Sequence, residues 1–171
     1  MRRLPPIDDA FLTEAPFILN ASLTVPQSPE QVWQVCIGDE LGSWVAMLDQ
    51  ARWHTPRPLG RGALRSVRLG RLVTILEEFY TWEEGRRQTF RVTEINLPVV
   101  RGWAEDIRLT PTSDGGTRLD YTIAIDNRLL RIVRVPRWLQ PRLDAFATSM
   151  MVGISTVLPP VNAAHLNPPT P

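Results

Sequence analysis

Alternating segments separated by short turns occupy the middle of the chain, from about residue 50 to residue 126. Apolar and polar residues alternate within each segment, which is typical of a strand with one buried face. The predicted strands are 51–54, 63–69, 72–82, 86–95, 102–110 and 117–126. Their connections are short and rich in Gly, Pro and Asp, so neighbouring strands are expected to pair as antiparallel hairpins. This part of the chain therefore predicts one antiparallel sheet.

Helical signals lie on both sides of that run. A further strand is predicted at 17–25, and after it Ser28 and Pro29 fit the N-cap and first position of a helix. A second short helical turn is predicted over 40–47. Toward the C-terminus, apolar residues recur every three or four positions, which predicts a long amphipathic helix that begins between 137 and 141. These residues are Leu139, Leu143, Phe146, Met150, Ile154 and Val157.

The order of elements predicts an α+β fold. We expect a curved antiparallel sheet of about seven strands wrapped around the long C-terminal helix, with two short helices after the first strand. The concave face of such a sheet is apolar and must be covered by the last helix, which tends to leave a cavity between them. We expect one domain over 17–158, a flexible N-terminal segment over 1–16, and a disordered Pro-rich tail over 159–171.

Charge and cysteine content exclude several classes of protein. Arginine supplies all 19 cations against 18 Asp and Glu, a net charge of +1, so the chain is not an electrostatic binder of nucleic acid. The absence of lysine excludes Schiff-base chemistry. With one cysteine and two distant histidines, we expect no internal disulfide, no metal and no cofactor. The sequence shows neither a signal peptide nor a membrane-spanning stretch, which predicts a cytoplasmic protein.

Five motifs stand out along the chain: Ser28–Trp33, Gly60–Arg65, Thr74–Trp82, Gly115–Leu119 and the terminal amphipathic helix. In this order they resemble the SRPBCC, or START-like, superfamily, which includes polyketide cyclases and dehydrases, birch-pollen-allergen-like proteins and lipid-transfer domains. The resemblance covers about residues 17–158. It implies a helix-grip fold with a cavity for a hydrophobic ligand. It leaves the function open, because members include enzymes, carriers and receptors.

Aromatic, aliphatic and Met side chains are predicted to line this cavity, as suits an apolar ligand, although they would equally fill a core. The candidate ligand-binding residues are Phe79, Phe90, Trp103, Glu105, Ile107, Tyr121, Ile123, Phe146 and Met150.

Three residues are candidates for acid–base chemistry: Glu105, Tyr121 and Glu77. Glu105 shares a strand face with Ile107, so its carboxyl group would either point into the cavity with a raised pKa or lie wetted at the cavity mouth. Glu77 would either do chemistry or form an ion pair with Arg65. A two-residue turn after strand 63–69 puts Arg65 on the other face, whereas a three-residue turn puts it near Glu77.

A basic strip precedes the last helix, with Arg128, Arg131, Arg134 and Arg137 at three-residue steps. It would bind an anionic membrane surface or an acidic partner, or else form a solvated outer face. The solvated face is the simpler interpretation, so membrane binding is not expected.

The sequence therefore favours a protein that binds a small, largely hydrophobic molecule, lipid or polyketide-like, between the sheet and the C-terminal helix. One alternative is an enzyme of the cyclase or dehydratase type that uses acid–base residues in the same cavity. Another is a module that binds a partner or a membrane surface through the strip from Arg128 to Arg137. Both a monomer and a homodimer remain possible.

Overall fold

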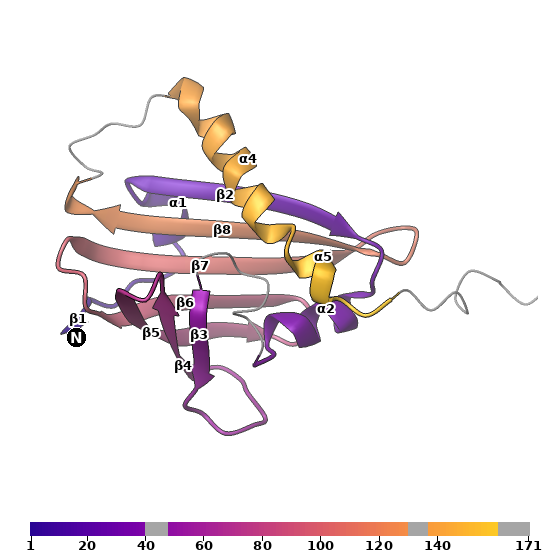
Figure 1. Ribbon diagram of the computed structural model, residues 1–171, viewed down its shortest axis with the longest axis horizontal. Helices are drawn as coiled ribbons and strands as arrows, with labels where there is room; N and C mark the ends of the chain where they lie inside the picture. The colour runs from indigo at the N-terminus through magenta and orange to yellow at the C-terminus, as the bar shows by residue number, and fades with distance from the viewer. Residues whose placement is uncertain (40–47, 130–136, 161–171) are drawn as a thin grey trace, which may run out of the picture.

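The protein is described here by a computed structural model, which places residues 1–39, 48–129 and 137–160 (Figure 1). The strands of the main sheet are β2 (Phe17–Val25), β3 (Leu48–Trp53), β4 (Leu64–Leu69), β5 (Val73–Glu83), β6 (Arg87–Ile95), β7 (Val100–Pro111) and β8 (Thr117–Asn127). They pair in the order β2-β8-β7-β6-β5-β4-β3, and every pair is antiparallel. The predicted seven-stranded antiparallel sheet is confirmed. The helical turn predicted at 40–47 lies outside the described residues.

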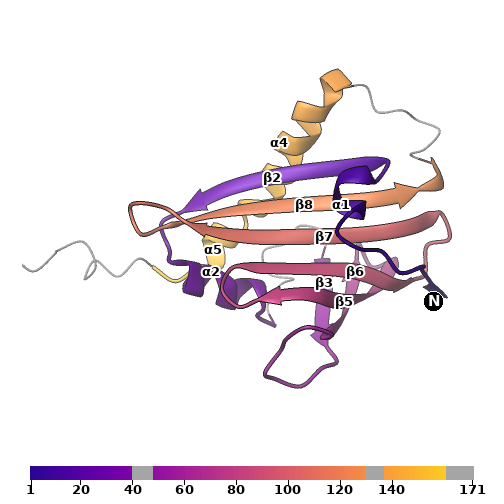
Figure 2. The ribbon, with the colours of Figure 1, turned by 180° about the vertical axis from the view of Figure 1, so that it is seen from behind.

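The sheet is curled and has two differently covered faces. Figures 1 and 2 show β3 and β4 turned toward the side that carries α2 (Pro29–Cys36), α4 (Gln140–Met151) and α5 (Ile154–Val157). We call this side the inner face. The opposite, outer face carries α1 (Phe11–Glu14), which Figure 2 shows in front of the strands.

The start of α2 follows the capping signal in the sequence. The Ser28 hydroxyl accepts a hydrogen bond from the Gln31 backbone N–H, and the Gln31 side chain accepts one from the Ser28 N–H. This reciprocal capping box satisfies two backbone donors that a helix start leaves unpaired. Val32 and Trp33 then turn inward and are fully buried against the sheet.

The β4–β5 hairpin settles the register that the sequence left open. Leu69 pairs with Val73, so the turn has three residues, and Arg65 lies directly opposite Glu77. Gly70 and Arg71 both adopt positive φ, at 52° and 61°. The wider turn therefore brings Arg65 and Glu77 to the same face of the sheet.

The C-terminal helix differs from the single long helix that we predicted. A 3-10 turn, η2 (Arg137–Leu139), leads into α4, and after Met151 the chain turns through Val152 and Gly153 before α5. Glycine is a poor helix former, which accounts for an interruption at this point. The expectation of a sheet wrapped around one long helix is therefore wrong.

Helix α4 runs along the open edge of β2. Gln140, Asp144 and Thr148, spaced four residues apart, face this edge strand. The Gln140 amide donates to the Ile18 carbonyl oxygen at 2.7 Å, and Asp144 Oδ1 accepts from the Asn20 N–H at 2.9 Å. Thr148 Oγ1 accepts a hydrogen bond from the Ser22 N–H, two residues further along β2, at 3.4 Å. Four residues of a helix rise about 6 Å, close to the rise of two residues of a strand. Every fourth residue of α4 therefore meets every second residue of β2.

The N-terminal segment, which we expected to be flexible, packs against the sheet: Leu4 joins the cluster of Val67, Ile75 and Val92, and residues 7–15 lie on the outer face. β1 (Arg2–Arg3) pairs with β6, and Leu4 and Leu12 are buried. Leu12 contacts a patch formed by Ala104 and Ala124. The segment has few apolar residues, but the small alanines of the sheet give them a surface on which to pack.

Candidate functional site

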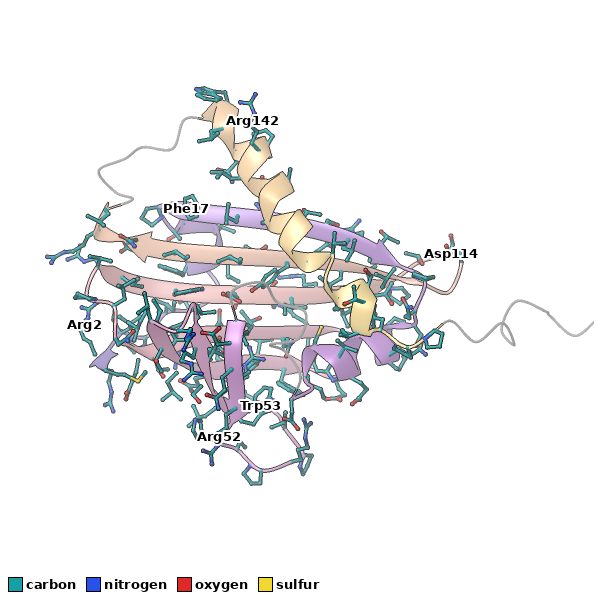
Figure 3. The ribbon with its side chains drawn as sticks, viewed as in Figure 1. Arg2, Phe17, Arg52, Trp53, Asp114 and Arg142 are labelled. Carbon is teal, nitrogen blue, oxygen red and sulfur yellow. The ribbon has the colours of Figure 1, made fainter. Side chains whose placement is uncertain are left out.

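An ion pair surrounded by aromatic rings lies on the inner face. Arg65 Nε on β4 is 2.6 Å from Glu77 Oε2 on β5, and the two side chains are 4% and 5% exposed. The Arg65 guanidinium also lies about 5 Å from three ring centroids, at 5.0, 4.9 and 5.2 Å. These rings belong to Trp53, Phe79 and Phe90. Trp53 is at the end of β3, the strand that curls over the sheet (Figure 3).

A second carboxyl group, that of Glu105 on β7, lies beside this aromatic cluster. Phe90 pairs with Glu105 across the β6–β7 ladder, and Glu105 is 7% exposed. Its Oε1 accepts a hydrogen bond from Trp103 Nε1 at 2.7 Å, and its Oε2 accepts one from the Tyr121 hydroxyl of β8. The predicted candidates Glu105, Tyr121 and Glu77 thus all lie on the inner face.

Burial controls the ionisation of this site. It raises the pKa of Glu105 to about 7, and the Glu77 carboxylate adds to the rise. The hydrogen bonds from Tyr121 and Trp103 oppose it, because they stabilise the charged form. Burial also raises the pKa of Glu77, against the opposing charge of Arg65. Glu105 therefore exchanges a proton near neutral pH, in a site that also contains a fixed positive charge.

Two buried polar atoms on this face lack a hydrogen-bond partner among the described residues. They are Trp53 Nε1, a donor, and Gln88 Oε1, an acceptor. Gln88 is 1% exposed and lies opposite both Trp82 and Ile107 in the sheet. Trp82 in turn contacts Trp53, at 6.5 Å between ring centroids. Since most buried polar groups in proteins are paired, these two atoms are candidates for hydrogen bonds to a bound molecule.

The other predicted ligand-binding residues divide into three groups. Phe79 and Phe90 are almost fully buried and stack on each other at 4.8 Å, so they fill the core as well as surround Arg65. Ile107 and Ile123 are partly buried, and Ile123 pairs with Glu105 across the β7–β8 ladder. Phe146 and Met150 belong to α4, and the structure does not describe their side chains.

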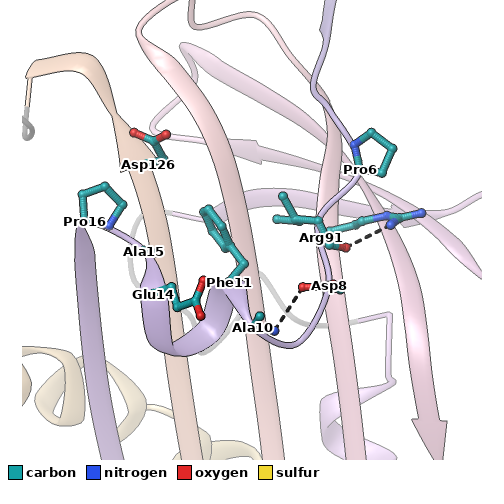
Figure 4. Close-up of a pocket in the computed structure, with 10 residues that line it drawn as sticks. Pro6, Asp8, Ala10, Phe11, Glu14, Ala15, Pro16, Arg91 and Asp126 are labelled. Carbon is teal, nitrogen blue, oxygen red and sulfur yellow. Dashed lines mark hydrogen bonds between the residues drawn. The ribbon is translucent and has the colours of Figure 1, made fainter.

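Two pockets lined by described residues lie outside the aromatic cluster around Arg65, and Tyr121 lines one of them. One, of about 590 Å³, opens on the outer face between the N-terminal segment, Arg91 and Asp126 (Figure 4). The other, of about 360 Å³, lies where Asp144 and Thr148 of α4 meet the β2 edge. The outer-face pocket was not predicted from the sequence, whereas the pocket beside α4 includes Tyr121, which was predicted to line a cavity between the sheet and the C-terminal helix.

Other features that the sequence singled out are not part of the site as formed by the described residues. Arg131 and Arg134 of the basic strip lie outside the described residues, and Arg128 is exposed. Cys36 is buried, and burial raises the pKa of its thiol to about 12, which leaves it unreactive. In the part of the chain that the structure describes, no group of three or more metal-binding side chains occurs. None of the described helices is long and apolar enough to cross a membrane.

Sequence reasoning missed Trp53 and Gln88. Trp53 lies within the short predicted strand 51–54, and its role depends on the curl that brings β3 over Phe79. The side chain of Gln88 on β6 points to the inner face. Its sequence neighbours Arg87 and Thr89 point to the outer face, where both donate hydrogen bonds to Asp106. The signal that could have identified Gln88 is that it shares a strand face with Phe90, where an alternating strand is expected to be buried.

Chemically, this arrangement combines a large apolar surface with a few convergent polar groups, as small-molecule sites do. The aromatic rings offer a flat apolar wall. Glu105 and Tyr121 offer one exchangeable proton and one hydroxyl group at its border.

The family described as "Polyketide cyclase / dehydrase and lipid transport" matches residues 16–153. No curated protein matches the chain by sequence.

Solved structures share the fold at low sequence identity. Ara h 8.0201 is 13% identical, with a TM-score of 0.58 over 82% of this chain and 96% of its own. TTHA0849 from Thermus thermophilus is 18% identical, with a TM-score of 0.62 over 82% and 95%. A START superfamily protein from Mycobacterium smegmatis is 12% identical, with a TM-score of 0.60 over 81% and 92%. The chain therefore belongs to the polyketide cyclase / dehydrase and lipid transport family, within the SRPBCC superfamily.

Proposed function

We propose that this protein binds a small, largely hydrophobic molecule, lipid or polyketide-like, on the inner face between the sheet and the α4–α5 segment. The observation that carries the proposal is the pair of buried, unpartnered polar atoms beside the aromatic cluster, Trp53 Nε1 and Gln88 Oε1. A core made only for stability would leave neither unpaired, because each costs about 1–3 kcal/mol. A ligand with an apolar body and a polar substituent would pack on the rings and pair these atoms. The description of the family, which names lipid transport, agrees with such a ligand.

The test is binding of an uncharged apolar fluorophore, N-phenyl-1-naphthylamine, to the purified protein. We expect saturable binding with one molecule per chain. Gln88→Leu should weaken binding of native ligands found by native mass spectrometry, but should change the affinity of this fluorophore little. Arg101→Ala, on an exposed residue of the same sheet, is the matched control. Absence of saturable binding of any apolar probe would reject the proposal.

A second candidate function is acid–base catalysis at the same site. It is favoured by one observation: Glu105, with a pKa of about 7, is hydrogen-bonded to a tyrosine hydroxyl. A carboxyl group with this pKa can both take up and release a proton near neutral pH.

Dehydration of a β-hydroxy ketone to the enone and water is a suitable assay, since it needs a proton removed beside the carbonyl and one added to the leaving hydroxyl group. Enone absorbance reports the reaction. Loss of turnover in Glu105→Gln, with probe binding retained, would support catalysis. Turnover unchanged in that variant would exclude Glu105 from it.

A further inference from the structure

The inner face contains two buried carboxyl groups and one guanidinium. Arg65 is paired with Glu77 at 2.6 Å. Among the described residues, no cation lies within ion-pair distance of Glu105, which instead accepts hydrogen bonds from two neutral donors, Trp103 and Tyr121. A buried carboxylate without a cation is costly, so the uncharged acid is favoured there.

The hydrogen bond between Glu105 and Tyr121 has two possible directions. When Glu105 is ionised it accepts from the Tyr121 hydroxyl, whose hydrogen is then fully used. When Glu105 is the acid, its own O–H can donate to Tyr121 Oη, which leaves the tyrosine hydrogen free. The acid form thus offers one O–H donor to a bound molecule, whereas the ionised form offers only the lone pairs of Tyr121.

We propose that the Glu105–Tyr121 pair recognises an uncharged hydrogen-bond acceptor on the ligand, of the ketone or ester carbonyl class, with Glu105 in its acid form. This inference rests on the proposed ligand-binding function. It narrows the ligand from any apolar molecule to one that carries a carbonyl group. It also makes affinity fall as pH rises, since ionised Glu105 withdraws the donor.

Charged and titratable groups from each neighbouring element affect this equilibrium. Glu77 of β5 raises the pKa of Glu105, and Arg65 of β4 lowers it. Tyr121 of β8 stays protonated, because burial raises its pKa well above the ordinary value. On α2, Cys36 remains a neutral thiol. On β6, Phe90 and Gln88 carry no charge. Since Glu77 and Glu105 interact, their protons titrate as a coupled pair, and variants of each are needed to separate them.

The experiment compares two probes that differ only at the carbonyl group: prodan, an uncharged naphthalene ketone, and its analogue with the ketone replaced by methylene. Affinities are measured at pH 5.5 and pH 8.5, where circular dichroism checks that the protein is folded. We expect prodan to bind about fivefold more tightly at pH 5.5 than at pH 8.5, the scale of one hydrogen bond. The methylene analogue should bind equally at both.

Three variants separate the contributions. Glu105→Gln, which cannot ionise, should remove the pH dependence of prodan binding. Tyr121→Phe should abolish the preference for prodan over its analogue. Glu77→Gln should keep both effects and shift the midpoint of the pH dependence downward, since it removes a neighbouring negative charge.

The outcomes distinguish this inference from the function on which it rests. Equal, pH-independent binding of both probes would overturn the carbonyl inference and leave apolar binding intact. So would tighter prodan binding at pH 8.5, or failure of both probes while N-phenyl-1-naphthylamine binds. If no apolar probe binds, the proposed function fails and the inference fails with it.

Discussion

Glu105 makes the stability of this protein depend on pH in an unusual direction. Its folded-state pKa of about 7 lies above the ordinary value of 4.5. The folded protein therefore holds a proton that the unfolded chain has lost between these two values, and stability falls as pH rises from about 4.5 to about 7. The shift corresponds to roughly 3 kcal/mol.

Glu105→Gln should remove this loss. We expect the free energy of unfolding of the variant, measured by urea denaturation, to decline less between pH 5 and pH 8 than that of the wild type, because the raised pKa of Glu77 still contributes to the decline. Glu94→Gln, on a partly exposed carboxylate of β6, is the control and should follow the wild type. Parallel curves for wild type and Glu105→Gln would show that Glu105 has an ordinary pKa.

The Arg65–Glu77 pair predicts a non-additive mutant pair. Arg65→Met leaves a buried carboxylate without its cation, which should cost about 3–5 kcal/mol at neutral pH. Adding Glu77→Leu removes that charge, so the double variant should recover most of the loss. Urea denaturation of Arg65→Met, Glu77→Leu and the double variant measures the coupling. If the double variant is less stable than Arg65→Met, the pair is not held as described.

At the scale of elements, the positions of the strands could be predicted, whereas the register in which they pair could not. The strand Phe17–Val25 and the capped start of α2 follow from alternation and from Ser28–Pro29, which are local signals. The β4–β5 turn was ambiguous, because both a two-residue and a three-residue turn fit Gly70–Arg71. The difference of one residue in the length of this turn decides whether Arg65 lies opposite Glu77. The candidate site could therefore not be assembled from the sequence.

The C-terminal helix shows a second limit. Of its predicted apolar stripe, Ile154 is buried and Leu139, Leu143 and Val157 are partly buried, whereas the buried Ala147 and Met151 lie one position away from the stripe. The stripe gave no partner for the polar positions of the helix. The structure pairs Asp144 and Thr148 with backbone groups of the β2 edge, a partner that side-chain patterns cannot reveal.

These contacts predict a local effect of mutation. Asp144→Ala removes the acceptor of the Asn20 N–H and should cost about 1 kcal/mol. Hydrogen exchange should speed up at Asn20, and Thr148→Val should do the same at Ser22. Asp144→Asn keeps a carbonyl acceptor in place and should preserve protection. Unchanged exchange at Asn20 in Asp144→Ala would mean that α4 does not cover this edge.

At the scale of the whole molecule, the sheet is covered on both faces, and the N-terminal segment forms the outer layer. It is fixed by backbone pairing of β1 with β6 and by polar contacts from the sheet. Arg91 donates to the Ile7 carbonyl oxygen at 3.0 Å, and Arg87 pairs with Asp9 at 2.9 Å. Since the candidate site lies on the inner face, these contacts of Ile7 and Asp9 are made on the opposite side of the sheet from that site.

One tight contact of this outer layer is between Phe11 and Gly102. A Cβ atom at Gly102 would lie 2.9 Å from Cζ of the Phe11 ring, which is too close for two carbon atoms. Gly102→Ala should therefore displace the ring and lower the free energy of unfolding by about 1–3 kcal/mol.

In a Phe11→Ala background the same substitution meets no ring, so its cost should shrink to well under half, a coupling that a double-mutant cycle measures by urea denaturation. Binding of N-phenyl-1-naphthylamine should stay unchanged in all three variants, because the inner face is separated from Phe11 by the sheet. An equal cost of Gly102→Ala in both backgrounds would contradict the Phe11 contact. A change in probe affinity would instead show that the two faces of the sheet are coupled.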